Sequence, residues 1–445
     1  MNSINEDDKI IDISFNQDNS CFAIATENGF KIYQTYPFKG PVERKMGGGI
    51  GKIQMLYKSN FLALLGGGTI PKFNNNKVVI WDDYERKVIS EIKFITPILN
   101  IKLKKDFLFV VCQKRIYIFD NKTYEIIETI NTRDNSKGLI AINSDPDSTI
   151  IAYPDKDIHK DKEKEVNKIT IKNFNLKKDN ETKITQHESV SFMTLNKQGT
   201  LLATANEKRT VISIHSCVDG HLLKEFKRGR EKVDDIYICF DNDDNFLAVG
   251  SNKGTIHIFS LKSTFQKLEN IKKKNSKNMK IEKEKKEVQN NEKEKNEKEN
   301  NEKENNKKEQ NKNEIIEKEN EEKEEEKDDI IIKKDKQDKE EGKDDLININ
   351  DKKVEEKSEE KEENKNIINE NIEKKEDIIL PENSKSLFGS KEKGFAKVKT
   401  NTKIKNVFTF AGNNLLIVIS YDNKYYQAEI DVKKGGLCKI TEKKI

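Results

Sequence analysis

The sequence predicts an all-β protein, a seven-bladed WD40-like β-propeller with a long disordered insertion in its sixth blade. Three observations predict this fold. Short runs of strand-forming residues alternate with turns, a sequence pattern recurs about every 45 residues, and one Lys/Glu/Asn-rich stretch interrupts the pattern near the C-terminus.

The strand-like runs are rich in Val, Ile, Phe and Tyr, which favour the pleated, half-buried surface of a sheet. Examples are "KVVIWDD" (77–83), "FLFVVCQKRIYIFD" (107–120) and "NLLIVIS" (414–420). Turn residues bound them and none carries a helical period. The folded part is therefore expected to be built almost entirely of short strands.

The repeat is clearest in the stretches 191–216 and 237–261, "SFMTLNKQGTLLATANEKRTVISIHS" and "YICFDNDDNFLAVGSNKGTIHIFSL". Leu202 aligns with Leu247, 45 residues later, and related copies stand at 13–35 and 408–430. A period of this length with several strands per unit is typical of propeller blades. The 322 residues outside the Lys/Glu/Asn-rich stretch have room for about seven such units.

The Lys/Glu/Asn-rich stretch covers residues 263–385 and contains 32 Lys against 39 Asp and Glu. Such a composition cannot bury enough apolar surface to offset the entropy lost on ordering, so we expect it to be disordered. The domain prediction is a first part of the propeller at 1–262, this insertion, and a closing part of the propeller at 386–445.

The folded part carries a basic excess, 51 Lys and Arg against 40 Asp and Glu. An anionic partner is expected, and the candidates are a phosphoinositide membrane, a nucleic acid or an acidic protein.

The N-terminus lacks the apolar core of a signal peptide and no apolar run spans a bilayer, so membrane contact should be peripheral. The five cysteines form no CxxC pair and predict reduced core residues of a cytosolic protein.

No catalytic or metal-binding motif emerges. "MGGGIGK" (46–52) lacks the first glycine of a P-loop and has Ile53 where the motif needs Ser or Thr, and "LLGGGT" (64–69) lacks the lysine. Both are expected to be tight turns. The five histidines show no metal-ligand spacing, so we predict no enzyme, no metal and no cofactor.

The stretch "KEFKRGREK" (224–232) places Lys227 and Arg228 next to each other where a strand ends. Neighbouring side chains of an extended chain point to opposite sides, so the pair cannot easily serve one site but can serve two. A solvated basic turn is the simpler interpretation of this stretch taken alone.

The chain resembles the PROPPIN family of phosphoinositide-binding propellers of autophagy, and most of all its smaller WIPI-type members. The resemblance spans almost all of the folded part, and its matching stretches are "FNQDNSCFAIATENGFKIY" (15–33), "LALLGGGTIPKFNNNKVVIWDD" (62–83), "TRDNSKGL" (132–139), "LNKQGTLLATANEKRT" (195–210), "FKRG" (226–229) and "FLAVGSNKGTIHIF" (246–259).

The resemblance implies two lipid headgroup pockets on one rim, with the two basic residues of the family's Phe-Arg-Arg-Gly motif facing opposite pockets. Lys227 replaces the first arginine here, and lysine lacks the bidentate fork that suits phosphate. The pocket of Arg228 keeps the family pattern and the pocket of Lys227 is altered, with Asn206, Arg209 and Ser213 replacing Ser, Gly and Arg. The implied headgroup-binding residues are Lys227, Arg228, His187, Lys208, Thr210, Ser251, Lys253, Gly254, Thr255 and His257.

Ordinary structural roles compete with these assignments. His257 fits a packed strand histidine, while Ser251 and Thr255 fit turn residues that hydrogen-bond locally. The resemblance also implies that Asn16 and Asp18 contact the bridge-like lipid-transfer protein of autophagy, whereas an ordinary Asx turn explains them as well.

The propeller-proximal end of the insertion, residues 262–286, has ten Lys against three Glu and a few apolar residues. We expect it to lie on anionic lipid, and a solvated linker is the alternative.

The function predicted from the whole sequence is a monomeric, cytoplasmic adaptor that is recruited to phagophore, endosomal or vacuolar membranes. It would bind phosphatidylinositol 3-phosphate and also the 3,5-bisphosphate, and no nucleic acid is expected as a partner. A lipid-independent propeller scaffold is the alternative.

Overall fold

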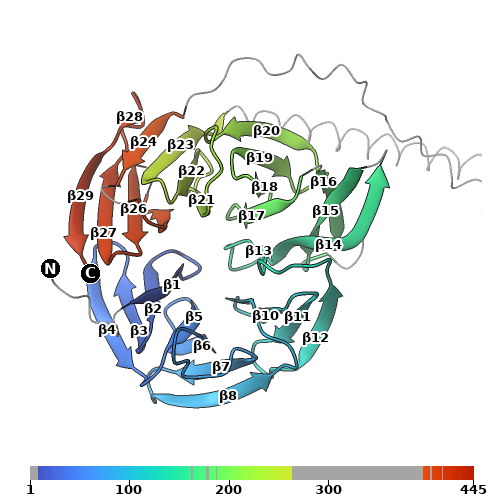
Figure 1. The fold of residues 1–445 in the computed structure, drawn as a ribbon, viewed down its shortest axis with the longest axis vertical. Coiled ribbons are helices and arrows are strands. Elements are labelled where there is room, and N and C mark those ends of the chain that lie inside the picture. Colours follow the sequence, from blue (N-terminus) through green and yellow to red (C-terminus); the bar gives the residue numbers. More distant parts are fainter. Residues whose placement is uncertain are drawn as a thin grey trace, which may run out of the picture. The chain divides into compact units, whose positions relative to one another are not determined.

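Seven sheets surround a central axis in the computed structural model (Figure 1). The structure describes residues 9–161, 164–176, 180–186, 188–262, 394–400, 403–412 and 414–445. Each sheet is built on a four-stranded antiparallel meander whose first strand lies nearest the axis and whose later strands lie progressively further out. The seven-bladed propeller that the 45-residue period predicts is therefore confirmed.

The seven sheets use the strands in chain order, except that β28 joins the sixth sheet after three strands of the seventh. They are β1 (Ile10–Phe15), β2 (Cys21–Thr26), β3 (Gly29–Gln34) and β4 (Lys39–Lys45); β5 (Ile50–Met55), β6 (Phe61–Gly66), β7 (Lys77–Asp82) and β8 (Lys87–Lys93); β9 (Asn100–Leu103), β10 (Phe107–Val111), β11 (Arg115–Asp120) and β12 (Ile126–Asn131); β13 (Ala141–Ile142), β14 (Ile150–Asp161), β15 (Lys164–Asn173) and β16 (Glu181–Gln186); β17 (Val190–Leu195), β18 (Leu201–Asn206), β19 (Val211–Ser216) and β20 (Leu222–Lys227); β21 (Ile236–Phe240), β22 (Phe246–Ser251), β23 (Thr255–Ser260), β24 (Ala396–Lys399) and β28 (Gly436–Leu437); and β25 (Asn406–Phe410), β26 (Leu415–Ser420), β27 (Lys424–Glu429) and β29 (Lys439–Lys444).

The core lies between the blades. One cluster of buried apolar side chains separates each pair of neighbouring sheets, so that the second strand of a blade is covered on both faces. All six residues of β22 are buried for this reason. Strands covered on both faces read as continuous apolar runs instead of alternating ones, which explains sequences such as "FLAVGS".

The ring closes by side-chain packing between its first and last sheets. Phe22 and Tyr33 of the first sheet pack in one cluster with Ile417 and Tyr425 of the last. The Tyr425 hydroxyl donates a hydrogen bond to the Thr35 carbonyl oxygen at 2.8 Å. Closure of the ring places every sheet between two neighbouring sheets and so protects both of its faces from water.

The insertion interrupts the sixth sheet, as the sequence predicts. Strand β23 pairs antiparallel with β24, joining Ile258 to Ala396 and His257 to Lys397 across the interrupting residues. The C-terminal segment then adds β28 parallel to β24. Residues 263–393 lie outside the described residues, so the predicted disorder of 263–385 and the lipid contact of 262–286 stay predictions.

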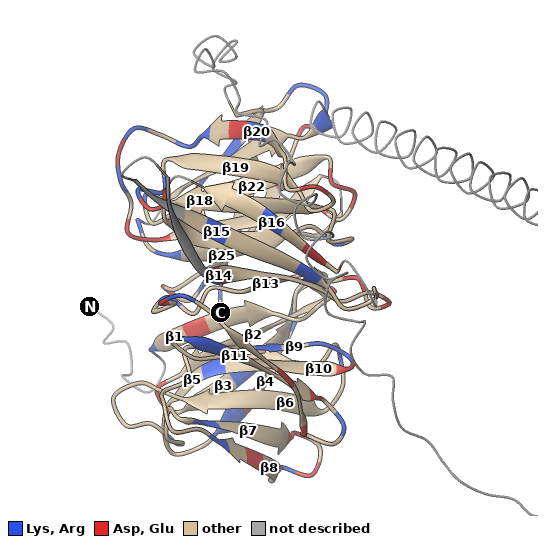
Figure 2. Ribbon diagram, turned by 90° about the vertical axis from the view of Figure 1, so that its right-hand side faces the viewer, with Lys and Arg blue, Asp and Glu red and all other residues tan. Residues whose placement is uncertain are grey.

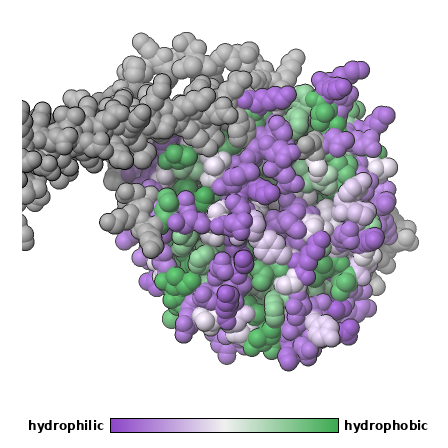
Figure 3. Space-filling view, turned by 180° about the vertical axis from the view of Figure 1, so that it is seen from behind, coloured by the Kyte–Doolittle hydropathy of each residue, from purple (hydrophilic) through white to green (hydrophobic). Residues whose placement is uncertain are grey.

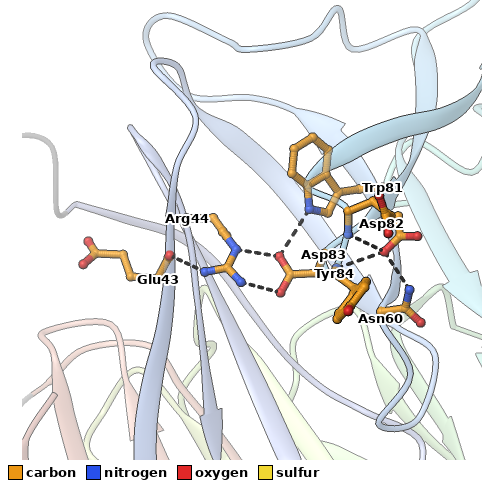
Figure 4. Close-up of polar contacts among 8 residues, drawn as sticks. Glu43, Arg44, Asn60, Trp81, Asp82, Asp83 and Tyr84 are labelled. Atoms are coloured by element: carbon orange, nitrogen blue, oxygen red, sulfur yellow. Dashed lines mark hydrogen bonds and ion pairs between the residues drawn. The ribbon is translucent and has the colours of Figure 1, made fainter.

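The Trp81-Asp82 dipeptide ends β7 and organises the turn that follows (Figure 4). The Asp82 carboxylate accepts hydrogen bonds from the Asn60 amide at 2.6 Å and from the Tyr84 backbone N–H at 2.9 Å. The next residue, Asp83, receives a bidentate contact from Arg44 of β4, at 2.8 and 2.9 Å. This fork–fork pair ties the outer strand of the first blade to the second blade.

Lys104 follows β9 and is only 2% exposed. Its ammonium donates hydrogen bonds to the Asn143 side-chain oxygen at 3.0 Å, to the Asp145 carbonyl oxygen at 2.6 Å and to the Ser148 carbonyl oxygen. Burial lowers the pKa of Lys104 to about 8, and nearby Asp145 partly offsets that effect. The side chain therefore joins the third blade to the loop at the start of the fourth.

The two glycine-rich segments lie side by side in the second blade, where β5 pairs with β6. A Cβ on Gly66 would clash with the Phe73 backbone, and Gly67 lies directly against the Gly51 Cα. The backbones approach too closely for any side chain, which is a packing reason for glycine at these positions.

We expect Gly66→Ala to destabilise the protein by at least about 2 kcal/mol, because Phe73 must move to admit the methyl group. Gly229→Ala is the matched control, since a Cβ there meets no atom within 4 Å. Thermal or urea unfolding of both variants checks this, and equal midpoints for the two would show that the close approach is unimportant.

Within the described ranges, no helix is long and apolar enough to cross a membrane. All five cysteines are free, and Cys112 and Cys217 are buried. Exposed large apolar side chains such as Ile70, Tyr84 and Ile95 come from separate loops. The face in Figure 3 accordingly shows hydrophobic patches interspersed among hydrophilic side chains.

Candidate functional site

Strand β20, the outer strand of the fifth blade, places Lys227 and Arg228 on different faces. Phe226 stacks on Phe259 of the sixth blade, with ring centroids 4.6 Å apart. Side chains alternate along a strand, so Arg228 lies on the same side as Phe226 and Lys227 on the other. Lys227 is exposed, and its backbone pairs with Val211. The geometry agrees with the expectation of two basic residues that face different sides.

Arg228 is half-buried and held in place by backbone oxygens. Its Nε donates to the Arg209 carbonyl at 2.7 Å and its Nη2 to the Glu231 carbonyl at 2.5 Å. The backbone N–H of Arg228 extends the pairing of β19 with β20 by donating to the Thr210 carbonyl oxygen at 2.9 Å. Burial lowers the pKa of Arg228, which remains a cation at neutral pH. The guanidinium is therefore preorganised, with one amino group outside these carbonyl contacts.

His257 and Thr255 face the fifth blade from β23. Phe259 of the same strand packs against Phe226, and residues 255, 257 and 259 share one face of the strand. Burial lowers the pKa of His257 to about 4, with further contributions from Lys397 and Arg228. Thus Arg228, Thr255 and His257 come together between the fifth and sixth blades.

A histidine with a depressed pKa also affects stability. Because the folded-state pKa is about 4 against an ordinary value of 6.5, the His257 contribution to stability is fully present above pH 6.5. It is lost as the pH falls from 6.5 towards 4. An anion beside the imidazole would reverse part of this effect by favouring the charged form.

The turn between β22 and β23 carries Ser251, Lys253 and Gly254. Ser251 is 6% exposed, and its hydroxyl lies 3.5 Å from the Lys253 backbone N–H. Gly254 has a φ of 75°, and its carbonyl accepts from the Thr400 N–H at 2.9 Å. Lys253 is exposed and lies 3.8 Å from the Glu231 carboxylate. The turn presents a lysine beside Arg228, while Ser251 acts inside the turn.

The corresponding turn of the fifth blade, with Lys208 and Thr210, is built differently. Asn206 replaces serine, and its side-chain oxygen accepts from the Thr210 N–H at 2.9 Å. Its amide donates to the Glu188 carboxylate at 2.7 Å. Lys208 is exposed. A carboxylate therefore stands beside this second candidate pocket, where it opposes the binding of a phosphate.

Two other departures from the family pattern act on the same side. Arg209 takes the place of glycine and adopts a φ of 55°, close to the 75° of its counterpart Gly254, so it holds the turn with a strained backbone. Ser213 donates to the Glu225 carboxylate at 3.2 Å. His187, predicted for this pocket, lies outside the described residues.

Asn16 and Asp18 form the turn between β1 and β2. Asn16 is 3% exposed; its amide donates to the Tyr57 carbonyl at 3.1 Å and its side-chain oxygen accepts from the Cys21 N–H at 3.0 Å. Asp18 is exposed and caps Ser20 at 2.6 Å. Of the two, Asp18 is the one in a position to meet a partner, while Asn16 shapes the turn. Their partner role stays a prediction.

Sequence reasoning missed residues that only the fold brings to the site. Lys397 pairs with His257 across the insertion, and Glu231 accepts from Arg228. Glu188 stands at the altered pocket. The repeat register indicated which residues occupy equivalent turns, but no local signal links residue 257 to residue 397. Among the described residues, no group of three or more His, Cys, Asp or Glu could hold a metal ion.

The fold and the rim geometry define a class: seven-bladed propellers with a basic site between two adjacent blades. The sequence model of the family described as PROPPIN matches residues 10–279. The chain belongs to the PROPPIN family, which confirms the resemblance carried by the "FKRG" and "SNKGTIH" stretches.

Curated proteins of several organisms are similar to this chain. The SVP1-like protein 2 of Debaryomyces hansenii is 33% identical over 288 residues, which cover 57% of this chain and 66% of that protein. The SVP1-like protein 2 of Saccharomyces cerevisiae is 34% identical over 284 residues, covering 58% and 63%. Autophagy-related protein 18e of Arabidopsis thaliana is 31% identical over 262 residues, covering 57% and 66%. The chain thus matches slightly less than two thirds of the length of these relatives.

Solved structures share the fold at low identity. Kluyveromyces lactis Hsv2 superposes with a TM-score of 0.59 at 16% identity, covering 98% of this chain and 99% of that one. The complex of KlAtg21 with the coiled-coil of AgAtg16 gives the same TM-score, identity and coverage. At this identity the likeness shows the fold alone.

Proposed function

We propose that this chain is a non-catalytic, cytoplasmic adaptor of autophagy that binds phosphatidylinositol 3-phosphate, and also the 3,5-bisphosphate, on phagophore, endosomal or vacuolar membranes. One observation carries the proposal. Between the fifth and sixth blades, Arg228 lies on the side of the fifth blade that faces Thr255 and His257 of β23, and the exposed Lys253 lies in the turn before that strand.

This arrangement suits a phosphate monoester. Phosphate oxygens require several charge-assisted donors, and a guanidinium, an imidazole, a hydroxyl and an ammonium supply them here. The half-buried setting of Arg228 strengthens its electrostatic interactions relative to those of an exposed lysine. The Glu188 carboxylate makes the pocket of Lys227 the weaker of the two.

The partner side of the proposal rests on different residues. Asp18 is exposed at the turn after β1, on the blade next to the closure of the ring, and it would contact a bridge-like lipid-transfer protein. KlAtg21, which shares this fold, is solved in complex with a coiled-coil of AgAtg16, so the fold supports protein partners. The basic stretch 262–286 would add electrostatic attraction to anionic lipid.

Flotation with vesicles that differ only in phosphate position tests the function. Vesicles with phosphatidylinositol 3-phosphate should float the protein, and those with the 4-phosphate at equal charge should not. Equal flotation with both would indicate a response to total anionic charge. No flotation with either would leave the lipid-independent scaffold.

Lipid binding should also depend on pH through His257. A bound phosphate favours the imidazolium, so the pKa of His257 in the complex lies above its free value of about 4. Binding therefore takes up a proton, and affinity gains from His257 as the pH falls from 7 to 5. The lipid phosphate itself titrates near pH 6, so the measurement is the affinity ratio of wild type to His257→Gln on the same vesicles. A ratio that stays constant between pH 7 and 5 would exclude a contact with His257.

A further inference from the structure

A cavity of about 630 Å³ lies on the propeller axis, enclosed by the first strands of the blades. Its lining includes residues of β1, β5, β9, β17, β21 and β25. Arg228, Thr255 and His257 are absent from the lining, so this space is separate from the rim site.

Basic residues predominate among the charged residues of the lining, with seven Lys or Arg against four Asp. Two of them, Lys52 and Lys102, occupy successive inner strands, β5 and β9 (Figure 2). Ile53 and Ile101 next to them pack into the clusters between blades, so the lysines point the other way, towards the axis.

The charges of these two lysines are incompletely neutralised. Lys52 lies 3.7 Å from the Asp12 carboxylate on β1. Lys102 forms no hydrogen bond or ion pair with the described part of the chain, although it is only partly exposed. Burial and the neighbouring Lys52 lower the pKa of Lys102. The Asp12 carboxylate thus lies near both ammonium groups in the cavity and can neutralise only one of their two charges.

The other charges around the axis leave this basic excess in place. Lys405 lies over the Tyr421 ring at 4.8 Å, and Tyr421 is 3.5 Å from Asp12. Asp234 and Asp235 line the cavity from the two positions just before β21. A multiply charged oxyanion between Lys52 and Lys102 would supply the missing counter-charge and hydrogen-bond acceptors.

We propose that the axial cavity binds a phosphate-type oxyanion between Lys52 and Lys102, independently of the rim site. The ligand chemistry fits both inorganic phosphate and a phosphate of a soluble inositol phosphate. The site would give the propeller a response to soluble phosphate that requires no membrane.

The test measures the thermal midpoint of the full chain against increasing inorganic phosphate, with sodium chloride at matched ionic strength as the reference. In a second arm inositol hexakisphosphate is the probe. A ligand that binds only the folded state raises the midpoint in proportion to the logarithm of its concentration. The arm with the lower half-saturating concentration identifies the source of the phosphate.

We expect wild type to gain several degrees over the chloride reference in at least one arm. Lys102→Met and Lys52→Met should each raise the half-saturating concentration at least tenfold. Lys58→Met, at an exposed loop lysine outside the cavity, should leave it unchanged. Arg228→Ala should keep the phosphate response and lose vesicle binding, which separates this proposal from the proposed function.

Lys102→Met removes a charge without a partner, so we expect its midpoint in phosphate-free buffer to be no lower than that of wild type. Lys52→Met provides an independent test if Lys102→Met folds poorly. A phosphate response equal in wild type and both variants, or a wild-type response equal to that of chloride in both arms, would overturn the proposal.

Discussion

Arg228→Ala is expected to lower the affinity for vesicles with phosphatidylinositol 3-phosphate roughly 10- to 100-fold. A charge-assisted hydrogen bond to phosphate is worth about 1.5–3 kcal/mol, and this cation is already oriented by the carbonyls of Arg209 and Glu231. Little rotamer entropy is then lost on binding, so most of the interaction energy appears as affinity. Surface plasmon resonance on immobilised vesicles gives the ratio directly.

Lys227→Ala is the matched control, because it removes a cation from the adjacent position on the same strand. We expect it to weaken binding less than about threefold, since Lys227 is exposed and an exposed charge contact contributes little. Glu188 near the same side reduces its value further. Equal losses for the two variants would contradict the assignment of the site to the blade five–six gap. Thermal midpoints close to wild type would exclude a folding defect in either variant.

Lys104→Met should be the most destabilising single change at a charged residue, by about 3 kcal/mol. The substitution leaves the Asn143 side-chain oxygen and the carbonyls of Asp145 and Ser148 without their buried donor. The cost of such orphaned acceptors exceeds what the apolar methionine gains from burial. Chemical unfolding measured by circular dichroism checks the size of the effect.

Lys105→Met, at the exposed residue next along the chain, is the control for Lys104→Met and should change stability by less than about 0.5 kcal/mol. A Lys104→Met variant as stable as this control would show that the buried ammonium is dispensable. The link between the third and fourth blades would then have to depend on apolar packing alone.

The fold was predictable because two independent patterns agree. Leu202 and Leu247, matched by the repeat, lie at corresponding places in β18 and β22, and both are fully buried. The place of the insertion also follows from the sequence, because "TIHIFSL" and "GFAKVKT" supply two strands of one blade. The local signals and the global fold therefore agree, as expected for a repeat protein.

The site was predictable only in part. The placement of Lys227 and Arg228 on opposite faces follows from strand alternation alone. Their partners do not, because hydrogen bonds to carbonyls and the contact between residues 257 and 397 depend on how blades assemble. The Asn206–Glu188 contact likewise joins different parts of the chain, and it changes a pocket that the sequence shows only as altered.

The burial of Lys104 could not be predicted from the sequence. A lysine after a strand is normally expected at the surface, since ammonium groups are rarely buried without partners. Here the loop at 143–148 supplies three oxygens to one ammonium, and no periodicity in the sequence indicates that convergence. The position of Lys52 and Lys102 around one cavity could not be predicted either, because inner strands of different blades meet only in the closed ring.

The most direct test of the phosphate site is the titration of His257 by NMR, with and without soluble inositol 1,3-bisphosphate. The free imidazole should titrate near pH 4, and the ligand should raise its pKa by at least about one unit because the phosphate stabilises the imidazolium. The exposed His221, beside Asp219, serves as the internal control and should not respond. A His257 pKa that the ligand leaves unchanged, or a shift of equal size at His221, would contradict phosphate binding between the fifth and sixth blades.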